Sequence, residues 1–339
     1  MRKKILVTGG AGYIGSHVVR QLGESSYDVV VYDNCSTGSA ESVLYGKLII
    51  GDLVDTGHLY QIFAEHQFSA VLHFAASLIV PESVVHPLDY YANNTRNTLN
   101  LLRCCKVMGV KNFIFSSTAA VYGEVKENPV TESSPTHPIN PYGRSKLMSE
   151  WLIQDYAAAS SMHYVILRYF NVAGSQPNGL LGQMSPNATH LIRAACDAAL
   201  KRKPEVRIFG TDFPTPDGTA IRDYIHVEDL ATAHLDALDY LEKGGESQIF
   251  NCGYGQGYSV RQVIERVKTI SGVDFPVIAA PRRPGDPARV EACADKIRRV
   301  LGWQPKYNDL DEIIYTTISW EKERIKLPRQ GILNIAYAS

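Results

Sequence analysis

The sequence lacks the features that mark membrane-spanning, metal-binding and nucleic-acid-binding proteins. Lys and Arg number 34 against 35 for Asp and Glu, so the net charge of −1 leaves no positive surplus for nucleic acid or an anionic membrane. No apolar run reaches the roughly 20 residues that a membrane-spanning helix needs. The run that follows Lys4 is interrupted by Gly9 and Gly10, too early for a secretory signal. The six cysteines show no C-x-x-C pair and no metal-ligand spacing, which predicts no bound metal and a reducing compartment, the cytoplasm.

What the sequence does contain, at its start, is a glycine turn between a short apolar run and a helical pattern. Gly9, Gly12 and Gly15 are spaced three apart directly after the apolar run 5–7. This order presents the free N–H groups of a helix N-terminus to a diphosphate, and glycines allow the backbone to come close. A second apolar run ends in Asp33, where an acid holds a ribose 2′-hydroxyl and repels the 2′-phosphate of NADP. The pattern therefore predicts a dinucleotide site that favours NAD.

The first half of the sequence alternates apolar runs with helical patterns, which is typical of a parallel sheet covered on both faces. We expect an α/β fold: a Rossmann-type doubly wound parallel sheet with a smaller α/β substrate-binding domain. Beyond Asn171 the chain becomes rich in Gly, Pro, Asn and Gln. The predicted boundaries are 1–172 for the first domain and 173–339 for the second. A segment at about 220–252 is expected to return to the first domain, with the strand 222–227 at its sheet edge.

The pattern from Glu82 to Met108 predicts one long helix that carries Asn93, Asn94 and Asn97. Asparagine is a poor helix former. Its repeated use indicates side chains that bond across the helix to another segment, and plain solvent exposure is the alternative. Asp52 and Leu53, which follow a third apolar run, either flank an adenine or belong to a solvated loop.

Three polar side chains are predicted to form a proton-transfer site. Tyr142 and Lys146 lie four apart on a predicted helix and therefore share one face, and Thr118 follows the apolar run 113–115. A tyrosine has a pKa of about 10, which a lysine ammonium and a positive nicotinamide would lower. The hydroxyl of Thr118 would hold the substrate oxygen and relay its proton. An ordinary exposed helix pair is the alternative for Tyr142 and Lys146.

Several motifs together resemble the extended short-chain dehydrogenase/reductase superfamily. They are T-G-G-A-G-Y-I-G from Thr8, S-S-T-A-A-V-Y-G from Ser116, Tyr142-x-x-x-Lys146 and L-R-Y-F-N-V-A-G from Leu167. The second half narrows the resemblance, through I-F-G-T-D-F-P-T-P-D-G-T, I-R-D-Y-I-H-V-E-D-L-A and R-R-P-G-D, to the UDP-glucose 4-epimerase family. The likeness runs from Lys4 to about Trp320.

The resemblance implies a redox cycle in which tightly held NAD accepts a hydride from C4 of a UDP-sugar and returns it to the opposite face. The catalytic residues would be Tyr142, Lys146 and Thr118. By the family's pattern, NAD contacts fall on Gly9, Gly12, Tyr13, Ile14, Gly15, Asp33, Asn34, Asp52, Leu53, Phe74, Ala75, Ala76, Asn93, Lys146 and Phe170. The family pattern also implies a homodimer, formed through the long helices near 82–108 and 142–160.

The UDP-sugar would meet Thr118, Asn171, His190, Leu191, Arg207, Phe209, Arg222, Arg283 and Asp286 by the same pattern. The two arginines Arg222 and Arg283 suit a diphosphate with about two negative charges, because guanidinium groups make bidentate bonds. A salt bridge to Asp223 or Asp286 is the alternative fate of these arginines. Asp286 would accept bonds from ribose hydroxyls. His226 is expected to be a buried structural imidazole.

Three positions depart from the family's usual residues. Leu78 stands where many members carry a lysine that reaches the NAD diphosphate. Thr118 replaces a common serine and keeps its hydroxyl. Val290 stands where a bulky tyrosine often lies beside the sugar, so UDP-N-acetylglucosamine stays open as a substrate; a shift of one residue would place Arg289 there instead. UDP-xylose/arabinose epimerisation also remains open.

Two other functions are less favoured. A sugar-nucleotide dehydratase or decarboxylase commonly needs an acidic pair after the strand-end hydroxyl, and here Thr118 is followed by Ala119 and Ala120. An NAD-sensing regulator tends to lose the Tyr/Lys pair, which this sequence keeps.

Overall fold

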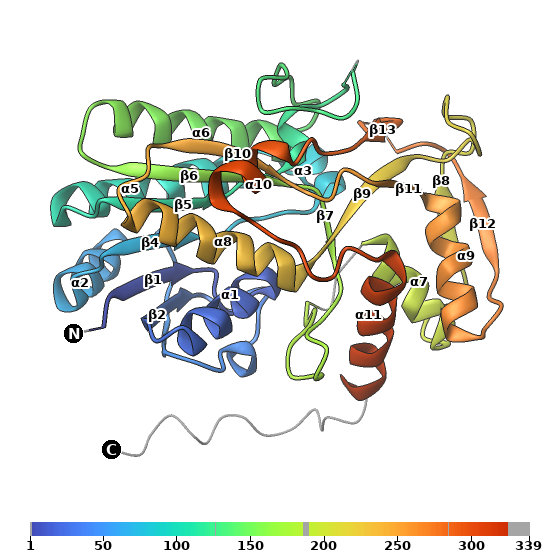
Figure 1. Ribbon diagram of the computed structural model, residues 1–339, viewed down its shortest axis with the longest axis horizontal. Helices are drawn as coiled ribbons and strands as arrows, with labels where there is room; N and C mark the ends of the chain where they lie inside the picture. Colours follow the sequence, from blue (N-terminus) through green and yellow to red (C-terminus); the bar gives the residue numbers. More distant parts are fainter. Residues whose placement is uncertain (1, 126, 186–189, 284, 325–339) are drawn as a thin grey trace.

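A seven-stranded parallel sheet forms the centre of the protein (Figure 1). The computed structural model describes residues 2–125, 127–185, 190–283 and 285–324. The strand order is β10-β6-β5-β4-β1-β2-β3, so the chain reverses direction across the sheet between β1 and β4. Such a reversal opens a crevice at the carboxyl ends of the strands. The strands are β1 Lys4–Thr8, β2 Asp28–Asp33, β3 Lys47–Ile50, β4 Ala70–His73, β5 Asn112–Ser116, β6 His163–Tyr169 and β10 Gln248–Cys252.

Helices cover both faces of this sheet, as the alternation predicted (Figure 1). Ile5 and Val7 of β1 pack toward α1 Tyr13–Glu24, α8 Val227–Glu242 and α10 Asp295–Leu301. Leu6, between them, packs on the opposite face, toward α2 Thr56–His66, α5 Asn97–Met108 and α6 Pro141–Ala158. Successive strand residues point to opposite faces, so an apolar run is buried on both.

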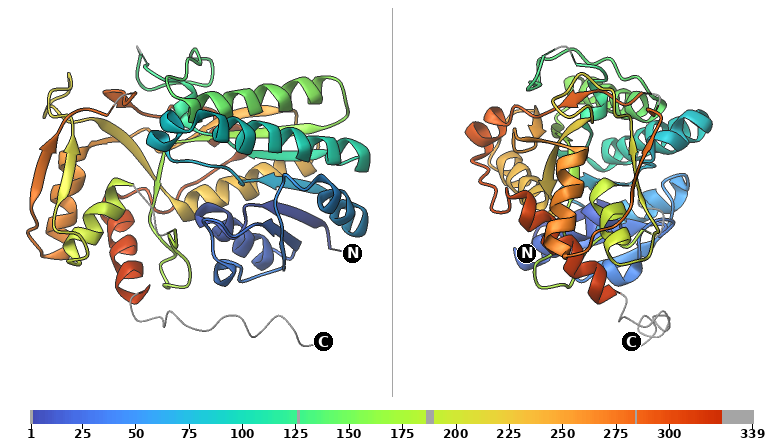
Figure 2. Two further views of the ribbon diagram at one scale, coloured as in Figure 1. Left: turned by 180° about the vertical axis from the view of Figure 1, so that it is seen from behind. Right: turned by 90° about the vertical axis from the view of Figure 1, so that its right-hand side faces the viewer.

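The second part of the chain forms two small sheets with their own helices (Figure 2). One sheet joins β7 Asn171–Ala173, β9 Ile221–His226, β11 Gly257–Ser259 and β13 Arg289–Val290; the other pairs β8 Val206–Phe209 with β12 Val277–Ala280. The helices α7 Leu191–Ala199, α9 Val260–Ser271 and α11 Leu310–Arg324 pack around a core of their own.

The strand that returns to the large sheet is β10, which pairs in parallel with β6. The prediction that the strand at 222–227 would occupy this edge was wrong. This segment forms β9, which pairs with β7, β11 and β13 in the four-stranded sheet. The crossover α8 returns the chain to the sheet, because its apolar face packs with β5 and β6.

The predicted single helix over 82–108 is divided. It consists of α3 Val80–Val85, α4 Pro87–Tyr90, a π-helix Tyr91–Arg96 and then α5. Pro87 accounts for the first break, because proline cannot donate the backbone hydrogen bond of a helix interior. π-Helical turns are rare overall, and many of those that occur lie at functional sites. A short 3₁₀-helix lies at Ala40–Ser42 and another at Ala119–Val121.

The asparagines of this segment do bond across it, as predicted. Asn94 accepts from the backbone N–H of Ser77 at 2.8 Å and donates to Ser77 O at 3.0 Å and Ser145 Oγ at 2.9 Å. Asn93 donates to Ser77 Oγ and accepts from Asn97. The π-helix is therefore tied both to the loop after β4 and to α6. Within the described part of the chain, no helix is long and apolar enough to cross a membrane.

Candidate active site

The glycine turn between β1 and α1 leaves room for a diphosphate. Gly9 adopts φ +73°, and a methyl group there would lie 2.5 Å from the backbone nitrogen of Ala75. A methyl on Gly15 would lie 2.3 Å from Gly9 O, so these glycines allow the turn, the helix and β4 to approach closely. Gly12 caps α1 without a side-chain acceptor, and the first turn of α1 carries no acid. Its N–H groups and dipole are thus available to an anion, which fits the diphosphate of NAD.

Asp33 lies at the end of β2, beside this turn. Its two carboxylate oxygens accept from Ala11 N at 2.9 Å and from Cys35 N at 2.8 Å, which leaves lone pairs for further donors. Burial raises the pKa of Asp33, and the two backbone bonds partly oppose that rise. This carboxylate fits a ribose diol, held at a fixed place against the glycine turn.

The loop after β3 carries the two residues predicted to flank adenine. Asp52 accepts from Asn34 Nδ2 at 2.7 Å and from Val54 N at 2.9 Å, so it links this loop to the end of β2. The side chain of Leu53 is buried in the core beneath the sheet. Asp52 and Asn34 therefore offer polar groups at the surface, and the side chain of Leu53 contributes packing.

Four further residues predicted to contact NAD lie near the carboxyl ends of β4 and β6: Phe74, Ala75, Ala76 and Phe170. The backbone N–H groups of Phe74 and Ala75 both donate to Thr8 O, at 2.9 and 3.2 Å, and Ala76 follows them. Phe170 is buried directly after β6. The hydroxyl of Tyr13 donates to Gly174 O at 2.5 Å, so this side chain joins the two parts of the chain.

Leu78, where a lysine was the family expectation, has 52% of its surface exposed. It supplies no charge at this position, so a diphosphate bound here would depend on the glycine turn and the N-terminus of α1.

Tyr142, Lys146 and Thr118 are brought together as predicted. Tyr142 and Lys146 lie in the first two turns of α6, which begins at Pro141 after the cap Asn140, whose side chain accepts from Gly143 N at 2.8 Å. Thr118 caps the 3₁₀-helix after β5 and accepts from Ala120 N at 3.1 Å. The hydroxyls of Thr118 and Tyr142 are hydrogen-bonded to each other, and all three side chains are buried.

The electrostatics of this cluster differ from the prediction. Burial raises the pKa of Tyr142, and the hydrogen bond with Thr118 only partly offsets that rise. Burial lowers the pKa of Lys146 to about 7, against a smaller opposing effect of Glu150. The Lys146 ammonium donates to Ser116 O at 2.9 Å, and its nitrogen lies 4.9 Å from the centroid of the Phe115 ring. The expected lowering of the Tyr142 pKa is therefore not produced by the chain alone, because desolvation outweighs the hydrogen bond with Thr118.

Four of the residues predicted for UDP form two contacting pairs. Arg222 of β9 is ion-paired with Asp286 at 2.6 Å, which is the alternative that the sequence left open. The guanidinium carbon of Arg283 lies 3.8 Å from the centroid of the Phe209 ring. Asp223 takes no part, because its carboxylate accepts from three backbone N–H groups.

Of the other residues predicted for UDP, Arg207 and Asn171 lie on strands next to these pairs, whereas His190 and Leu191 belong to the start of α7. Arg207 shares one face of β8 with Phe209, two residues on, and is 63% exposed at its side chain, where it pairs with Glu205 at 2.8 Å. Asn171 begins β7, which is paired with β9, and is exposed. His190 caps α7 and Leu191 begins it.

His226 is buried, as predicted, and Val290 rather than Arg289 points into the protein. His226 is buried, bonds to Thr316 Oγ1 at 3.1 Å and stacks on Tyr307, so its role is structural. Burial lowers its pKa to about 3. Val290 is buried in a cluster with Phe170, whereas Arg289 turns away to pair with Glu291 at 2.6 Å. Val290, not Arg289, therefore lies on the side of the catalytic helix.

The residues that hold this site in place were not predicted from the sequence. Ser117 and Arg168 lie within the motifs that begin at Ser116 and Leu167, and both bond to Glu150 of α6. The available signal was spacing: Glu150 follows Lys146 by four residues and thus shares its helix face. An acid on the buried face of a helix needs a partner, which the pattern of one helix cannot identify.

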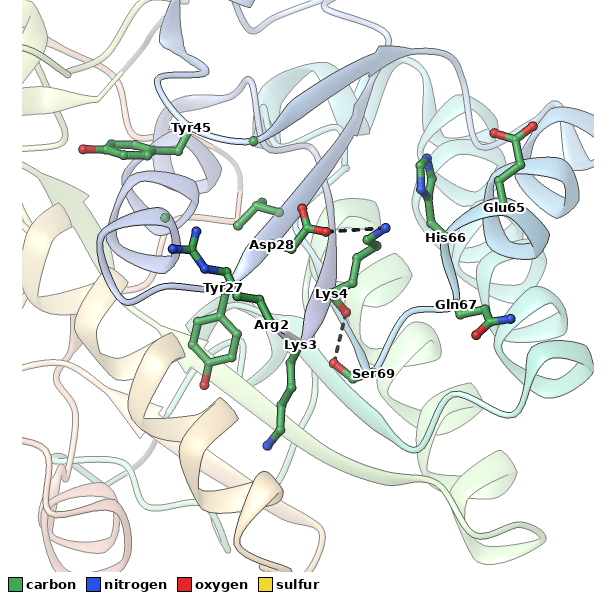
Figure 3. Close-up of a pocket in the computed structure, with 13 residues that line it drawn as sticks. Arg2, Lys3, Lys4, Tyr27, Asp28, Tyr45, Glu65, His66, Gln67 and Ser69 are labelled. Carbon is green, nitrogen blue, oxygen red and sulfur yellow. Dashed lines mark hydrogen bonds and ion pairs between the residues drawn. The ribbon is translucent and has the colours of Figure 1, made fainter.

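A cavity of about 900 Å³ lies elsewhere (Figure 3). It is at the amino ends of β1 and β2, opposite the edge that carries the catalytic cluster. Its Lys4 is paired with Asp28 at 3.4 Å, and Lys3 is paired with Glu242 at 2.9 Å (Figure 3 shows the first pair). These internal pairs neutralise the lysines, so the chemistry is assigned to the carboxyl edge.

Comparisons with known proteins agree with this geometry. A model of the NAD dependent epimerase/dehydratase family matches residues 5–253. The UDP-glucose 4-epimerase of Azospirillum brasilense is 52% identical over 320 residues, which cover 94% of this chain and 92% of the relative. The crystal structure of UDP-glucose 4-epimerase from Bifidobacterium longum in complex with NAD+ and UDP has a TM-score of 0.91 at 39% identity, covering 95% and 99% of the two chains. The UDP-Glc/GlcNAc 4-epimerase of Campylobacter jejuni is 50% identical, with a TM-score of 0.83 and the same coverage.

Proposed function

The chain belongs to the NAD-dependent epimerase/dehydratase family, and we propose that Tyr142, Thr118 and Lys146 perform its chemistry. The activity is NAD-dependent epimerisation of UDP-glucose at C4, which yields UDP-galactose. The observation that carries the assignment of residues is the buried hydrogen bond between the hydroxyls of Tyr142 and Thr118. It lies at the same sheet edge as the glycine turn, so a sugar held there meets a proton acceptor beside the dinucleotide site.

The residues of the chain move the proton. When bound, NAD supplies the hydride acceptor and donor for C4 and a positive ring beside the phenol. Tyr142, as phenolate, takes the proton of the sugar 4-hydroxyl, with Thr118 holding that oxygen. The 4-keto sugar then turns about its link to the diphosphate, and Tyr142 returns the proton to the oxygen once the other face is presented. Lys146 holds positive charge within the site, which favours the phenolate.

The substrate is held by its UDP part, which leaves the sugar free to turn. We assign the diphosphate to Arg222 and Arg283 and the ribose to Asp286. The ion pair between Arg222 and Asp286 fixes both side chains before the ligand arrives, which reduces the ordering cost of binding. In this proposal residues 1–172, with the segment at about 220–252, hold NAD, and the rest of 173–339 holds the UDP-sugar.

A second substrate, UDP-N-acetylglucosamine, is favoured by one position. Val290 is smaller than the tyrosine often found there, and it packs beside Phe170 rather than turning outward. A smaller side chain leaves volume for an N-acetyl group. The 50% identical relative from Campylobacter jejuni is described as a UDP-Glc/GlcNAc 4-epimerase.

We also propose a homodimer formed through α5 and α6, which run side by side along one face (Figure 2). Trp151 and Met148 of α6 are 54% and 40% exposed, three residues apart and thus on one helix face, and Val107 of α5 is 63% exposed. Leu88, in α4, is 78% exposed. Large apolar side chains that gather on a surface favour a protein partner. The cytoplasm remains part of the proposal, supported by six free thiols.

The test is to incubate the purified protein, loaded with NAD, with UDP-glucose, UDP-N-acetylglucosamine and the UDP-pentoses in turn and to resolve the epimers. Interconversion of UDP-glucose and UDP-galactose is expected, with UDP-N-acetylgalactosamine formed from the second substrate. Loss of water from the sugar, or no turnover of UDP-glucose, would overturn the proposal. Val290→Tyr should then remove the N-acetyl activity and keep the hexose activity.

A further inference from the structure

A buried ion pair lies directly behind the catalytic cluster. Arg168 of β6 donates to Glu150 of α6 from Nε at 3.0 Å and from Nη2 at 2.6 Å, in a two-pronged arrangement. Glu150 is fully buried, and 4% of the surface of Arg168 is exposed. The pair joins α6, the helix that carries Tyr142, to β6, the strand that directly follows it in the sequence, so it fixes where the helix lies on the sheet.

Both flanks of Thr118 are tied to this pair. On one side, Ser117 donates its hydroxyl to Glu150 Oε1, and Ser117 itself is completely buried. On the other side, the hydroxyl of Tyr122 accepts from Arg168 Nη1 at 3.1 Å. Tyr122 also donates to Asn251 Oδ1 at 2.6 Å, which connects the cluster to β10.

A second bond runs parallel to the first. Lys146, one turn before Glu150, donates to the backbone oxygen of Ser116 at 2.9 Å. Two successive residues before Thr118 are therefore bonded to two successive turns of α6. The distance between the Thr118 hydroxyl on the loop and the Tyr142 hydroxyl on the helix depends on these bonds.

We infer that the Glu150–Arg168 pair, acting through Ser117 and Tyr122, positions Thr118 against Tyr142 for proton transfer. This inference rests on the proposed function. Glu150, Arg168, Ser117 and Tyr122 are positioning residues, because the contacts described for them run to one another and to the protein frame. Their effect is on the alignment of the two reacting hydroxyls, where small displacements are costly to rate.

A contribution to folding stability does not by itself explain a buried ion pair at this position. Removing two charges from water is costly, and replacing a buried ion pair by apolar side chains of similar volume is often neutral or stabilising. Apolar groups could thus fill this space, but they could not accept from Ser117 or donate to Tyr122. The charged pair is therefore needed at this position for its hydrogen bonds to Ser117 and Tyr122.

The first test compares two serine variants of the NAD-loaded enzyme. Ser117→Ala removes only the bond to Glu150, and we expect kcat for UDP-glucose to fall at least about tenfold, with KM within about twofold and NAD retained. Ser149→Ala is the matched control: it is equally buried and next to Glu150, but its hydroxyl donates to Ser145 O and Asn94 O. Equal kcat values in the two variants would overturn the inference.

The second test separates positioning from stability. The double variant Glu150→Leu with Arg168→Met replaces the pair by apolar groups, which we expect to keep the thermal unfolding midpoint within a few degrees of the wild type. Its kcat should remain at least about tenfold low, and restoring Arg168 alone with Glu150→Asp should recover part of it. A double variant with wild-type kcat would show that the pair is only structural. Should the double variant fail to fold, the serine comparison still decides.

The outcome also distinguishes this inference from the proposed function. If the wild-type enzyme does not epimerise any UDP-sugar, the proposed function fails and the variants are not compared. If the wild type is active and Ser117→Ala matches Ser149→Ala, only the positioning role fails.

Discussion

Lys146 Nζ lies 2.9 Å from the backbone carbonyl oxygen of Ser116 and donates to it. The bond holds the ammonium against the end of β5, two residues before Thr118, rather than leaving it free on the surface of α6. A fixed charge needs no rearrangement when a phenolate forms nearby, which is how preorganised electrostatics lower a barrier. The lysine is therefore bonded to the same loop that carries Thr118, whose hydroxyl we assign to the proton relay.

Replacing Tyr142 by Phe should remove most turnover and leave NAD in place. The ring stays and fills the same buried volume, whereas the proton acceptor is lost, so we expect kcat to fall by a factor of about 10²–10⁴. Epimer formation from UDP-glucose measures the first effect, and the NAD content of the purified protein the second. Thr118→Ser should keep most of the rate, and Thr118→Val should not. A Tyr142→Phe enzyme with unchanged kcat would exclude the phenol as the base.

Asp33→Ala should weaken the binding of NAD far more than that of NADP. The carboxylate would hold the ribose 2′-hydroxyl of NAD and repel the phosphate of NADP. Dissociation constants of both cofactors, measured by titration calorimetry, give the comparison. Asp28→Asn is the control, because Asp28 begins the same strand and pairs with Lys4 at the opposite edge. An equal loss for both cofactors would count against the ribose contact.

Two glycines with similar backbone angles should respond differently to alanine. Gly9 and Gly109 adopt φ +73° and +69°, so each alanine pays about 1 kcal/mol of left-handed strain. A methyl at Gly109 meets no atom within 4 Å, whereas at Gly9 it meets the backbone of Ala75 at 2.5 Å. Gly9→Ala should therefore bind NAD more weakly and should have a lower free energy of unfolding than Gly109→Ala. Denaturant unfolding and NAD titration are the measurements. Matching values for both variants would show that the close approach of Gly9 to Ala75 is not needed for stability or for NAD binding.

His234→Gln should flatten the pH dependence of stability. Burial lowers the pKa of His234 to about 4, against about 6.5 in the unfolded chain. Between these values the unfolded chain takes up a proton that the native protein does not, so stability is full above about pH 6.5 and is lost as pH falls toward 4. The slope of the unfolding free energy between pH 5 and 6 should be smaller in the variant by roughly 1 kcal/mol per pH unit.

The control for this measurement is His163→Gln, in an exposed ring at the start of β6. Urea unfolding at constant NAD concentration gives the free energies at each pH. A slope in His234→Gln equal to that of the wild type would show that His234 does not remain neutral in the native state.

Acidic substitutions on the exposed apolar face of α4 and α6 should produce monomers. Trp151→Asp with Leu88→Asp places two charges where the proposed partner would bury them. Light scattering measures the mass, and Tyr315→Asp, on α11 and 63% exposed, is a control of similar exposure. A wild-type chain that is already monomeric at micromolar concentration would exclude the dimer.

The parts of the fold that the sequence predicted correctly are those set by local spacing. The glycine turn, the alternation of strands and helices, and the pairing of Tyr142 with Lys146 depend on residues within one or two turns of each other. The strand at the sheet edge was misplaced because β9 and β10 are both short strands of mixed apolar and polar residues, and pairing across about 80 residues decides between them. Glu150 was missed for the same reason, since its partner Arg168 lies on another element.

The sequence predicted a lowered pKa for Tyr142, whereas burial raises the pKa in the folded chain. The extent of burial depends on the whole tertiary structure and cannot be read from the spacing of Tyr142 and Lys146. The break of the long helix at the π-turn likewise reflects contacts of Asn94 with Ser77 and Ser145, which single-helix propensity does not contain.

The order of the strands also constrains how the chain can be made. β6 is complete at residue 169, but its neighbour β10 is supplied only by residues 248–252. During synthesis, the growing sheet therefore carries an open edge while about 80 further residues emerge, and an unpaired strand edge invites pairing with other chains. A fragment ending near residue 172 would keep that edge permanently, together with uncovered apolar side chains where α8 packs. The large sheet of residues 1–172 is thus completed and covered by residues that come later in the chain, β10 at its edge and α8 on its face.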